Sequence, residues 1–214
     1  MGNIKVKKAL QIIRKLKKAY PYSKASSAHK TPFQLLITTI LSAQCTDVVS
    51  DKTASKLFSK YKDALGFAAA NQKTLEKEVR PTGLYRAKAR NIIAASKKIV
   101  TRFNNKVPGS MQGLIQLDGV GRKTANIVLS SGFKKSEGIA VDTHVKRVSL
   151  RLGLTSNTNP DKIEKDLLSI IPFRYWLDLN YILVAHGRRV CRARNPLCGE
   201  CLLINFCDFA RSRR

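Results

Sequence analysis

Four cysteines near the end of the chain have a spacing that could bind a metal centre. Cys191, Cys198, Cys201 and Cys207 form the pattern C-x6-C-x2-C-x5-C. Thiolates this close in sequence can enclose a metal without ligands from distant segments. Zinc sites more often combine two separated C-x-x-C pairs, and here only Cys198 and Cys201 form such a pair. The pattern favours a [4Fe-4S] cluster over zinc, and two disulfides in an oxidising compartment are a third alternative.

A glycine-containing turn in the middle of the chain predicts an anion-binding site. Residues 117–125 read L-D-G-V-G-R-K-T-A. Gly119 and Gly121 permit a tight turn and a close approach of the backbone to a partner. The turn leads into a predicted helix, whose first N–H groups lack partners within the helix and attract anions. A DNA phosphate could bind there without any base being read, whereas the alternative is an ordinary corner between two helices.

The charge of the chain indicates a negatively charged partner. The 214 residues include 40 Lys and Arg against 14 Asp and Glu, which gives a formal net charge of +26. Nucleic acid is the first candidate, because each neutralised phosphate releases a condensed counterion and strengthens binding. An acidic membrane surface is the second, and a lysine-rich protein without such a partner is the third. The most apolar run, residues 33–41, is too short to cross a bilayer.

The elements that position these residues are expected to be helices. Apolar side chains recur at helical spacing, and no alternating run is long enough to build a sheet. The basic N-terminal segment shows this spacing, and Thr31 with Pro32 predicts an N-cap and a first helical residue. The remaining helices are expected near residues 46–61, 74–79, 87–103, 111–116, 122–130, 142–152, 161–171 and 175–189.

This number of helices fits two lobes. The cysteine loop needs neighbours to pack on, and the nearest in sequence are the last helices of the chain. The amphipathic N-terminal helix has no evident partner in the middle of the chain, so we expect it to join the C-terminal lobe. The predicted division is one helical domain over residues 24–135 and a second made of residues 1–23 and 136–214.

Five motifs in this order resemble those of the helix-hairpin-helix DNA glycosylases, and most closely those of the endonuclease III family. They are L-S-A-Q-C-T-D at 41–47, G-L-Y at 83–85, the glycine turn at 117–125, V-D-T-H-V-K-R-V at 141–148 and H-G-R at 186–188. The four-cysteine loop follows them, so the resemblance extends over nearly the whole chain. It implies an all-α fold of two helical lobes with a DNA-binding cleft between them, a helix-hairpin-helix motif and a C-terminal [4Fe-4S] loop.

The resemblance implies that Lys123 and Asp142 are catalytic. Lys123 matches the amine that attacks C1′ of the sugar and forms a Schiff base. At the start of a predicted helix, the helix dipole disfavours an ammonium there and favours the free amine that a nucleophile needs. Asp142 matches the carboxylate that stabilises positive charge on the sugar, and it is also a good helix N-cap. β-Elimination of the 3′ phosphate would then cut the strand.

Further residues are expected to contact DNA. A base must leave the stack before its glycosidic bond is accessible. The resemblance implies that Gln44 fills the vacated space, that Leu84 enters the opposite strand, and that His144 lies near the DNA backbone. Phosphate contacts are expected from the hairpin and from two arginines of the cysteine loop. These residues are Gly119, Val120, Gly121, Arg122, Arg192 and Arg194.

Two residues depart from the pattern of the family. Asp118 stands where the family often has proline. Its charge would slightly weaken a phosphate contact, although aspartate can begin a turn through its side chain. Cys45 stands where a small residue such as alanine is common, and we interpret it as a small buried hydrophobe.

The expected enzyme is a bifunctional DNA glycosylase and AP lyase of base excision repair that removes oxidised pyrimidines. Its partner would be double-stranded DNA with a damaged base or an abasic site. A mismatch-specific glycosylase for uracil or thymine is one alternative. A monofunctional adenine- or thymine-mismatch glycosylase is another, although such relatives tend to lack the lysine at position 123. A non-catalytic DNA-binding iron–sulfur protein is another, but it leaves the pairing of Lys123 with Asp142 unexplained. We expect a monomer inside the cell, in the cytoplasm or nucleoid of a prokaryote, with no membrane partner.

Overall fold

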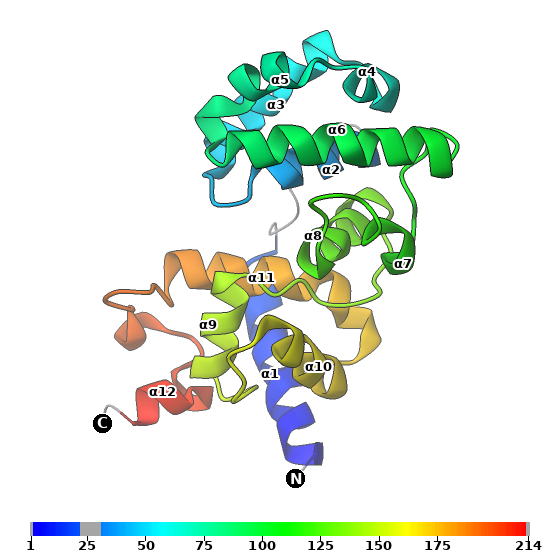
Figure 1. Cartoon of the computed structure of the whole chain (residues 1–214). Coiled ribbons are helices and arrows are strands. Elements are labelled where there is room, and N and C mark those ends of the chain that lie inside the picture. The colour runs from blue at the N-terminus through cyan, green and yellow to red at the C-terminus, as the bar shows by residue number, and fades with distance from the viewer. Residues whose placement is uncertain (1, 22–30, 213–214) are drawn as a thin grey trace. The chain divides into compact units, whose positions relative to one another are not determined.

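The computed structural model describes residues 2–21 and 31–212, and this part of the chain contains helices and turns but no strand (Figure 1). The all-α class predicted from the sequence is confirmed. Two compact units are present, which we call the hairpin unit (Ser26–Glu137) and the cysteine-loop unit (Met1–Ala25 with Gly138–Arg214). The domain boundary predicted between residues 23 and 24 lies outside the described residues. Within the described ranges, no helix is long and apolar enough to cross a membrane.

The hairpin unit is built around α6, its longest helix, which packs against α2, α4 and α5 (Figure 1). Phe67 of α4 lies at the centre of an aromatic cluster, with ring centroids 4.9 Å from Tyr61, 5.7 Å from Phe33 and 6.1 Å from Phe58. The helices of this unit are α2 (Pro32–Leu41), α3 (Asp47–Lys60), α4 (Ala64–Ala68), α5 (Gln72–Val79), α6 (Tyr85–Arg102), α7 (Met111–Leu114) and α8 (Arg122–Ile127).

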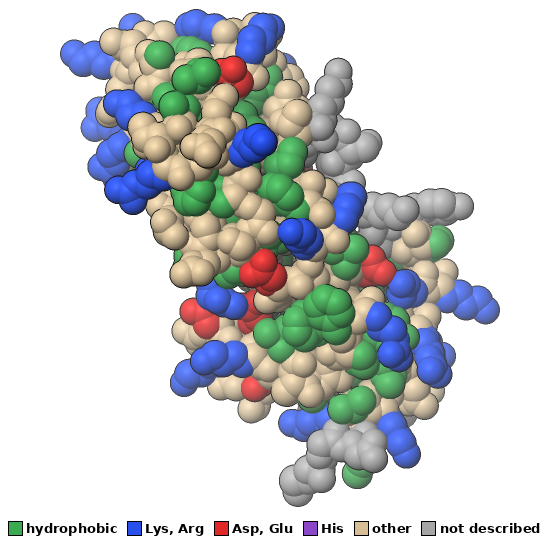
Figure 2. All heavy atoms as spheres, turned by 90° about the vertical axis from the view of Figure 1, so that its right-hand side faces the viewer, with side chains coloured by type: hydrophobic (Ala, Val, Ile, Leu, Met, Phe, Trp, Pro, Cys, Tyr) green, Lys and Arg blue, Asp and Glu red, His purple; other side chains and the backbone are tan. Residues whose placement is uncertain are grey.

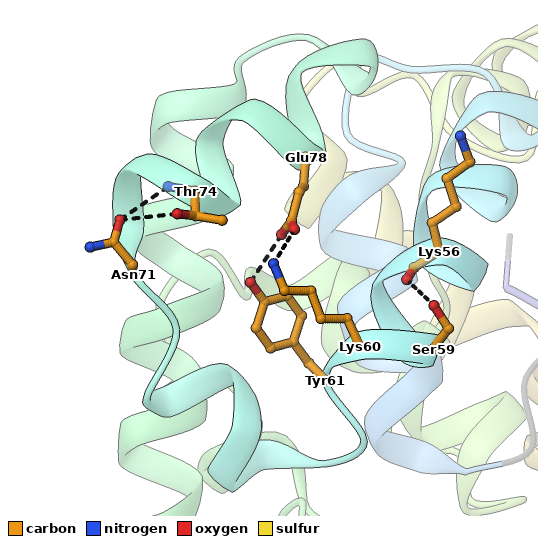
Figure 3. A network of polar contacts seen from close by, with 7 residues as sticks. All are labelled: Lys56, Ser59, Lys60, Tyr61, Asn71, Thr74 and Glu78. Carbon is orange, nitrogen blue, oxygen red and sulfur yellow. Dashed lines mark hydrogen bonds and ion pairs between the residues drawn. The ribbon is translucent and has the colours of Figure 1, made fainter.

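Side-chain caps fix where several of these helices begin. Thr31 accepts a hydrogen bond of 3.2 Å from the backbone of Gln34, as its position before Pro32 predicts. Asn71 caps α5 in the same way, through the backbone of Thr74 (Figure 3). Figure 3 also shows Glu78 of α5 accepting hydrogen bonds from Lys60 Nζ (2.6 Å) and the Tyr61 hydroxyl (3.0 Å). These contacts tie the end of α3 to α5.

The cysteine-loop unit combines the two ends of the chain. The apolar face of α1 is fully buried through Ala9, Ile12, Ile13 and Leu16, and this helix packs against α10 and α11. Each buried Leu or Ile contributes about 1.5–3 kcal/mol relative to an exposed one, so α1 is held chiefly by this face. The helices of this unit are α1 (Gly2–Ala19), α9 (Thr143–Arg151), α10 (Pro160–Ile170), α11 (Trp176–Arg189) and α12 (Asp208–Arg211).

Five segments differ from the helices expected from the sequence. α4 was not expected, because five residues are too few for a periodic pattern. The helix expected over 122–130 is α-helical only to Ile127 and continues as a π turn over Val128–Gly132. Three further segments are too short to show a helical period in the sequence, so they were not expected. They are the 3₁₀ turns at Cys198–Glu200 and Ile204–Phe206 and the helix α12.

Candidate functional site

The cysteine loop folds as a series of tight turns. Cys198, Cys201, Ile204 and Cys207 follow one another at intervals of three residues, and each backbone N–H donates to the carbonyl of the one before, at 3.2, 3.0 and 3.3 Å. Cys191 lies just after the end of α11. All four sulfurs belong to free cysteines, and all four residues line one cavity.

The surroundings of this cavity suit a buried cluster of thiolate ligands. Its wall includes apolar side chains such as Val148 and Leu152. Burial raises the pKa of the Cys201 and Cys207 thiols, so metal binding must displace protons from them. An Arg151 guanidinium nitrogen lies 3.4 Å from the Cys191 sulfur. Among the described residues, no group of three or more His, Cys, Asp or Glu side chains is placed to hold a single metal ion.

A buried histidine connects the cavity to the N-terminal helix. His186 of α11 is 1% exposed, and burial lowers its pKa to about 4, so the ring is neutral at pH 7. Its Nδ1 lies 3.1 Å from the Tyr20 hydroxyl, and its Nε2 lies 3.7 Å from the Cys201 sulfur. The end of α1, helix α11 and the cysteine loop are therefore joined by one side chain.

The glycine turn between α7 and α8 has the geometry that the sequence predicts. Gly119 has φ +75°, and a Cβ there would lie 2.9 Å from the side chain of Asn91 in α6. Val120 is buried. Gly121 is the N-cap of α8, and a Cβ there would meet nothing within 4 Å. The backbone at the start of α8 is therefore accessible, as an anion site requires.

Asp118, the departure next to this turn, is paired within the hairpin unit. Its Oδ2 lies 2.8 Å from Nζ of Lys98 in α6, and the same Nζ donates to the carbonyl of Gln116 at 2.9 Å. The carboxylate that would repel a phosphate is therefore partly neutralised by a neighbouring cation. Cys45, the other departure, is only partly buried, so its interpretation as a buried hydrophobe is wrong.

The two candidate catalytic residues lie in different units. Lys123 is exposed at the second position of α8 in the hairpin unit. Asp142 is the N-cap of α9 in the cysteine-loop unit, where its Oδ1 accepts hydrogen bonds from the backbone of His144 (2.9 Å) and Val145 (2.8 Å). Its Oδ2 lies 3.6 Å from Nδ1 of His144, and 19% of the side chain is exposed. The pairing of Lys123 with Asp142 stays a prediction.

Gln44 and Leu84 share an unusual backbone conformation. Their φ angles are +54° and +48°, in the left-handed region that few residues other than glycine adopt. Both side chains are exposed, and Leu84 retains 56% of its accessible surface. Residues held in such conformations cluster at ligand-binding sites, where the surrounding structure must maintain them.

The cysteine loop displays Arg192 and Arg194 at its surface, and both are exposed. Arg151 of α9 donates hydrogen bonds to the carbonyls of Arg192 (2.7 Å) and Ala193 (3.1 Å), and Arg147 donates to the Cys191 carbonyl (3.1 Å). Figure 2 shows Lys and Arg side chains spread over the visible surface of each unit, with few acidic ones. Both units therefore offer cations to a polyanion.

Four cations that hydrogen-bond to the loops carrying the candidate residues were not predicted from the sequence: Lys88, Lys98, Arg147 and Arg151. The sequence did indicate that Lys88 is buried, because it lies on the same helical face as the apolar residues Ile92 and Ile99. The other three lie on partly exposed helix faces, where a cation is ordinary.

Comparison with known proteins identifies relatives of this chain. Residues 37–173 match the HhH-GPD superfamily of base excision DNA repair proteins, and residues 191–207 match the iron–sulfur binding domain of endonuclease III. Endonuclease III of Synechocystis sp. is 47% identical, covering 97% of this chain and 95% of its own. Endonuclease III of Thermotoga maritima is 40% identical, covering 95% and 93%. The structure of a trapped endonuclease III–DNA covalent intermediate, an estranged-adenine complex, has a TM-score of 0.92 and 38% identity, covering 97% of this chain and 98% of that one.

Proposed function

Since the chain belongs to the endonuclease III family, we propose that it removes oxidised pyrimidines from double-stranded DNA by Schiff-base chemistry at Lys123. Membership in this family makes the protein a DNA N-glycosylase and AP lyase of base excision repair with an iron–sulfur cluster. The observation that carries the residue assignment is the position of Lys123. Its amine is exposed directly after a glycine turn with accessible backbone, where a bound phosphate would bring a deoxyribose close to it.

Lys123 would act as the nucleophile once the damaged base has left the stack. Its neutral amine attacks C1′, the C1′–N bond to the base breaks, and the base leaves with the bonding electrons and takes up a proton. The lysine nitrogen loses its protons as the sugar ring opens to an imine. Removal of a C2′ proton then expels the 3′ phosphate by breaking the C3′–O bond, and water finally hydrolyses the imine to free the enzyme.

Asp142 would act as the carboxylate of this reaction. Its Oδ1 is occupied by two backbone N–H groups at the start of α9, which fix the direction of the side chain. The second oxygen is left to stabilise positive charge at C1′ and to accept a proton from the attacking amine. His144 lies beside this oxygen and would contact a neighbouring phosphate through a ring N–H.

The remaining residues would bind the DNA and hold the lesion open. Gln44 would occupy the space that the base leaves, and Leu84 would enter the opposite strand. The turn from Gly119 to Arg122 and the exposed Arg192 and Arg194 would bind phosphates. Cys191, Cys198, Cys201 and Cys207 would hold the cluster, which supplies a rigid support for the loop that bears the two arginines.

Borohydride trapping tests this assignment, because reduction converts the imine into a stable amine bond to DNA. We expect a covalent adduct with a duplex that contains a ring-saturated pyrimidine, and none with Lys123→Gln. Lys135→Gln removes an exposed lysine of the same unit and should keep the adduct. An adduct of normal yield with Lys123→Gln would show that another amine attacks.

Base preference is tested with a panel of single-lesion duplexes, assayed with and without alkali. Faster release of ring-saturated pyrimidines than of uracil or thymine opposite guanine would support the proposal. The reverse order would favour a mismatch glycosylase. Base release without strand cleavage until alkali is added would contradict the lyase step.

A further inference from the structure

Helix α6 carries a lysine on the face that packs into the core. Lys88 is 3% exposed, whereas Ile92 and Ile99 on the same face are apolar and fully buried. Removing an ammonium from water is unfavourable unless hydrogen bonds replace the lost hydration. Burial accordingly lowers the pKa of Lys88, while a charge on the nearby Cys45 thiol acts in the opposite direction.

Two backbone carbonyls compensate this buried ammonium. Lys88 Nζ donates to the carbonyl of Leu41 at 2.7 Å and to that of Thr82 at 2.6 Å. Leu41 is the last residue of α2, and the carbonyls of a last turn cannot be paired within their own helix. A cation at this end of a helix is also favoured by the helix dipole. Both bonds direct the amine inward, so Lys88 is not available as a second nucleophile.

The two carbonyls lie two or three residues before the side chains expected to enter DNA. Gln44 follows Leu41 by three residues, and Leu84 follows Thr82 by two. Both Gln44 and Leu84 have left-handed backbones and exposed side chains. Such conformations persist only where neighbouring contacts determine them. The Lys88 ammonium therefore donates a hydrogen bond to the backbone shortly before Gln44 and another shortly before Leu84, although these two residues are far apart in sequence.

We propose that Lys88 is a positioning residue for base extrusion, which fixes the two loops that present Gln44 and Leu84 at one separation. This inference rests on the proposed insertion of those two side chains into DNA. Lys88 contacts neither DNA nor the reacting atoms, and it acts through the carbonyls of Leu41 and Thr82. The hydrogen bonds need a flexible, compact ammonium, which the planar guanidinium of arginine does not reproduce.

The test compares reactions that do and do not require insertion into a duplex, using the full chain with its cluster. The first is single-turnover release of a ring-saturated pyrimidine from a duplex with 2-aminopurine opposite the lesion. The second is cleavage of single-stranded DNA at a preformed abasic site. For Lys88→Met we expect glycosylase activity to fall by about ten- to a hundredfold, because small displacements of positioning groups have effects of this size. The rise in 2-aminopurine fluorescence on binding should fall with it, while cleavage of the single strand stays unchanged.

Ile99→Ala is the matched control, because it removes buried volume from the same helix at a distance of about 16 Å along its axis. At temperatures well below unfolding it should keep both the fluorescence rise and the glycosylase rate. If Lys88→Met lowers both reactions equally, or behaves like Ile99→Ala, Lys88 is merely structural and the inference is wrong. If Lys88→Met does not fold, Lys88→Arg is used in its place. For that variant we expect an intermediate loss of glycosylase activity on the duplex and no loss of single-strand cleavage.

A third comparison separates this inference from the proposed function. In a Gln44→Ala/Leu84→Ala background, Lys88→Met should cause little further loss of glycosylase activity, since the side chains that it positions are absent. An undiminished loss in that background would contradict the inference. If the Gln44→Ala/Leu84→Ala protein itself keeps the wild-type rate and fluorescence, insertion by these side chains is wrong, and the role of Lys88 falls with it. Trapping at Lys123 would stand in either case.

Discussion

Lys98 Nζ lies 2.8 Å from Oδ2 of Asp118, and the same nitrogen donates to the Gln116 carbonyl at 2.9 Å. Lys98 of α6 therefore contacts the segment before the glycine turn twice, through the Gln116 carbonyl and the Asp118 carboxylate. This pairing shows how an aspartate can stand beside a candidate phosphate site in a position where the family often has proline. The charge is kept, but a cation from the neighbouring helix lies next to it.

Replacing Asp118 by alanine should weaken the fold slightly and strengthen DNA binding. Both side chains of the pair are about one-third exposed, 33% and 36%, so the free energy of unfolding should fall by about 1 kcal/mol or less. Binding should tighten, because Lys98 would be left as an additional positive charge beside the hairpin. Urea unfolding and titration of DNA at several salt concentrations measure the two effects.

Removing Lys98 should have the opposite effect on DNA binding. Lys98→Met leaves Asp118 without its cation and frees the Gln116 carbonyl, so binding should weaken by more than the loss of one charge explains. Lys97→Met is the matched control, because Lys97 is the exposed neighbour on the same helix. Equal weakening by the two variants would mean that the hairpin does not depend on the Lys98 hydrogen bond and ion pair.

Asp142 has a capping role and a proposed catalytic role that substitution can separate. Asparagine caps helices about as well as aspartate, so Asp142→Asn should change the free energy of unfolding by less than about 0.5 kcal/mol. Asp142→Ala should lose about 1 kcal/mol, because the backbone of His144 and Val145 loses its acceptor. Both variants should lower the glycosylase rate by about a hundredfold or more if the carboxylate stabilises the developing charge. A stable Asp142→Asn with normal single-turnover kinetics would leave Asp142 as a cap alone.

The features of the fold that could be predicted from the sequence are those that depend on residues a few positions apart, such as helix starts. Thr31 before Pro32 and Asp142 before α9 marked helix starts because a cap needs only the next three residues. Lys88 and Arg151 were missed because their function depends on carbonyls about 6–47 positions away, which only the folded chain brings to them. The candidate site divides in the same way. Motifs predicted the residues that we expect to contact DNA, and the structure identifies side chains that hydrogen-bond to the loops that carry them.

The hydrogen bonds that Asp166 of α10 accepts should make the stability of the fold depend on pH. Hydrogen bonds from Thr155 and then from Asn157 lower the pKa of this carboxyl below its ordinary value of 3.8. A lowered folded-state pKa contributes stability at neutral pH that is lost as the pH falls from about 4 through the folded value. Asp166→Asn should therefore be slightly less stable than wild type at pH 7, with the difference shrinking below pH 4. Urea unfolding at several pH values measures this, and a difference that grows on acidification would contradict it.

Arg151 should control how the cysteine loop presents its arginines. Its guanidinium donates to the carbonyls of Arg192 and Ala193 and to the Cys191 sulfur, and it lies 4.4 Å from the centroid of the Phe209 ring. A lysine cannot make this forked set of bonds, so Arg151→Lys should loosen the loop although the charge is kept. DNA affinity should fall and its salt dependence should decrease by about one to two units of slope, one for each phosphate that the loop no longer neutralises. The same substitution should have little effect in an Arg192→Ala/Arg194→Ala background, and visible absorbance of the cluster reports separately on loss of the metal. If Arg151→Lys weakens binding equally in both backgrounds, Arg151 does not act through the two arginines.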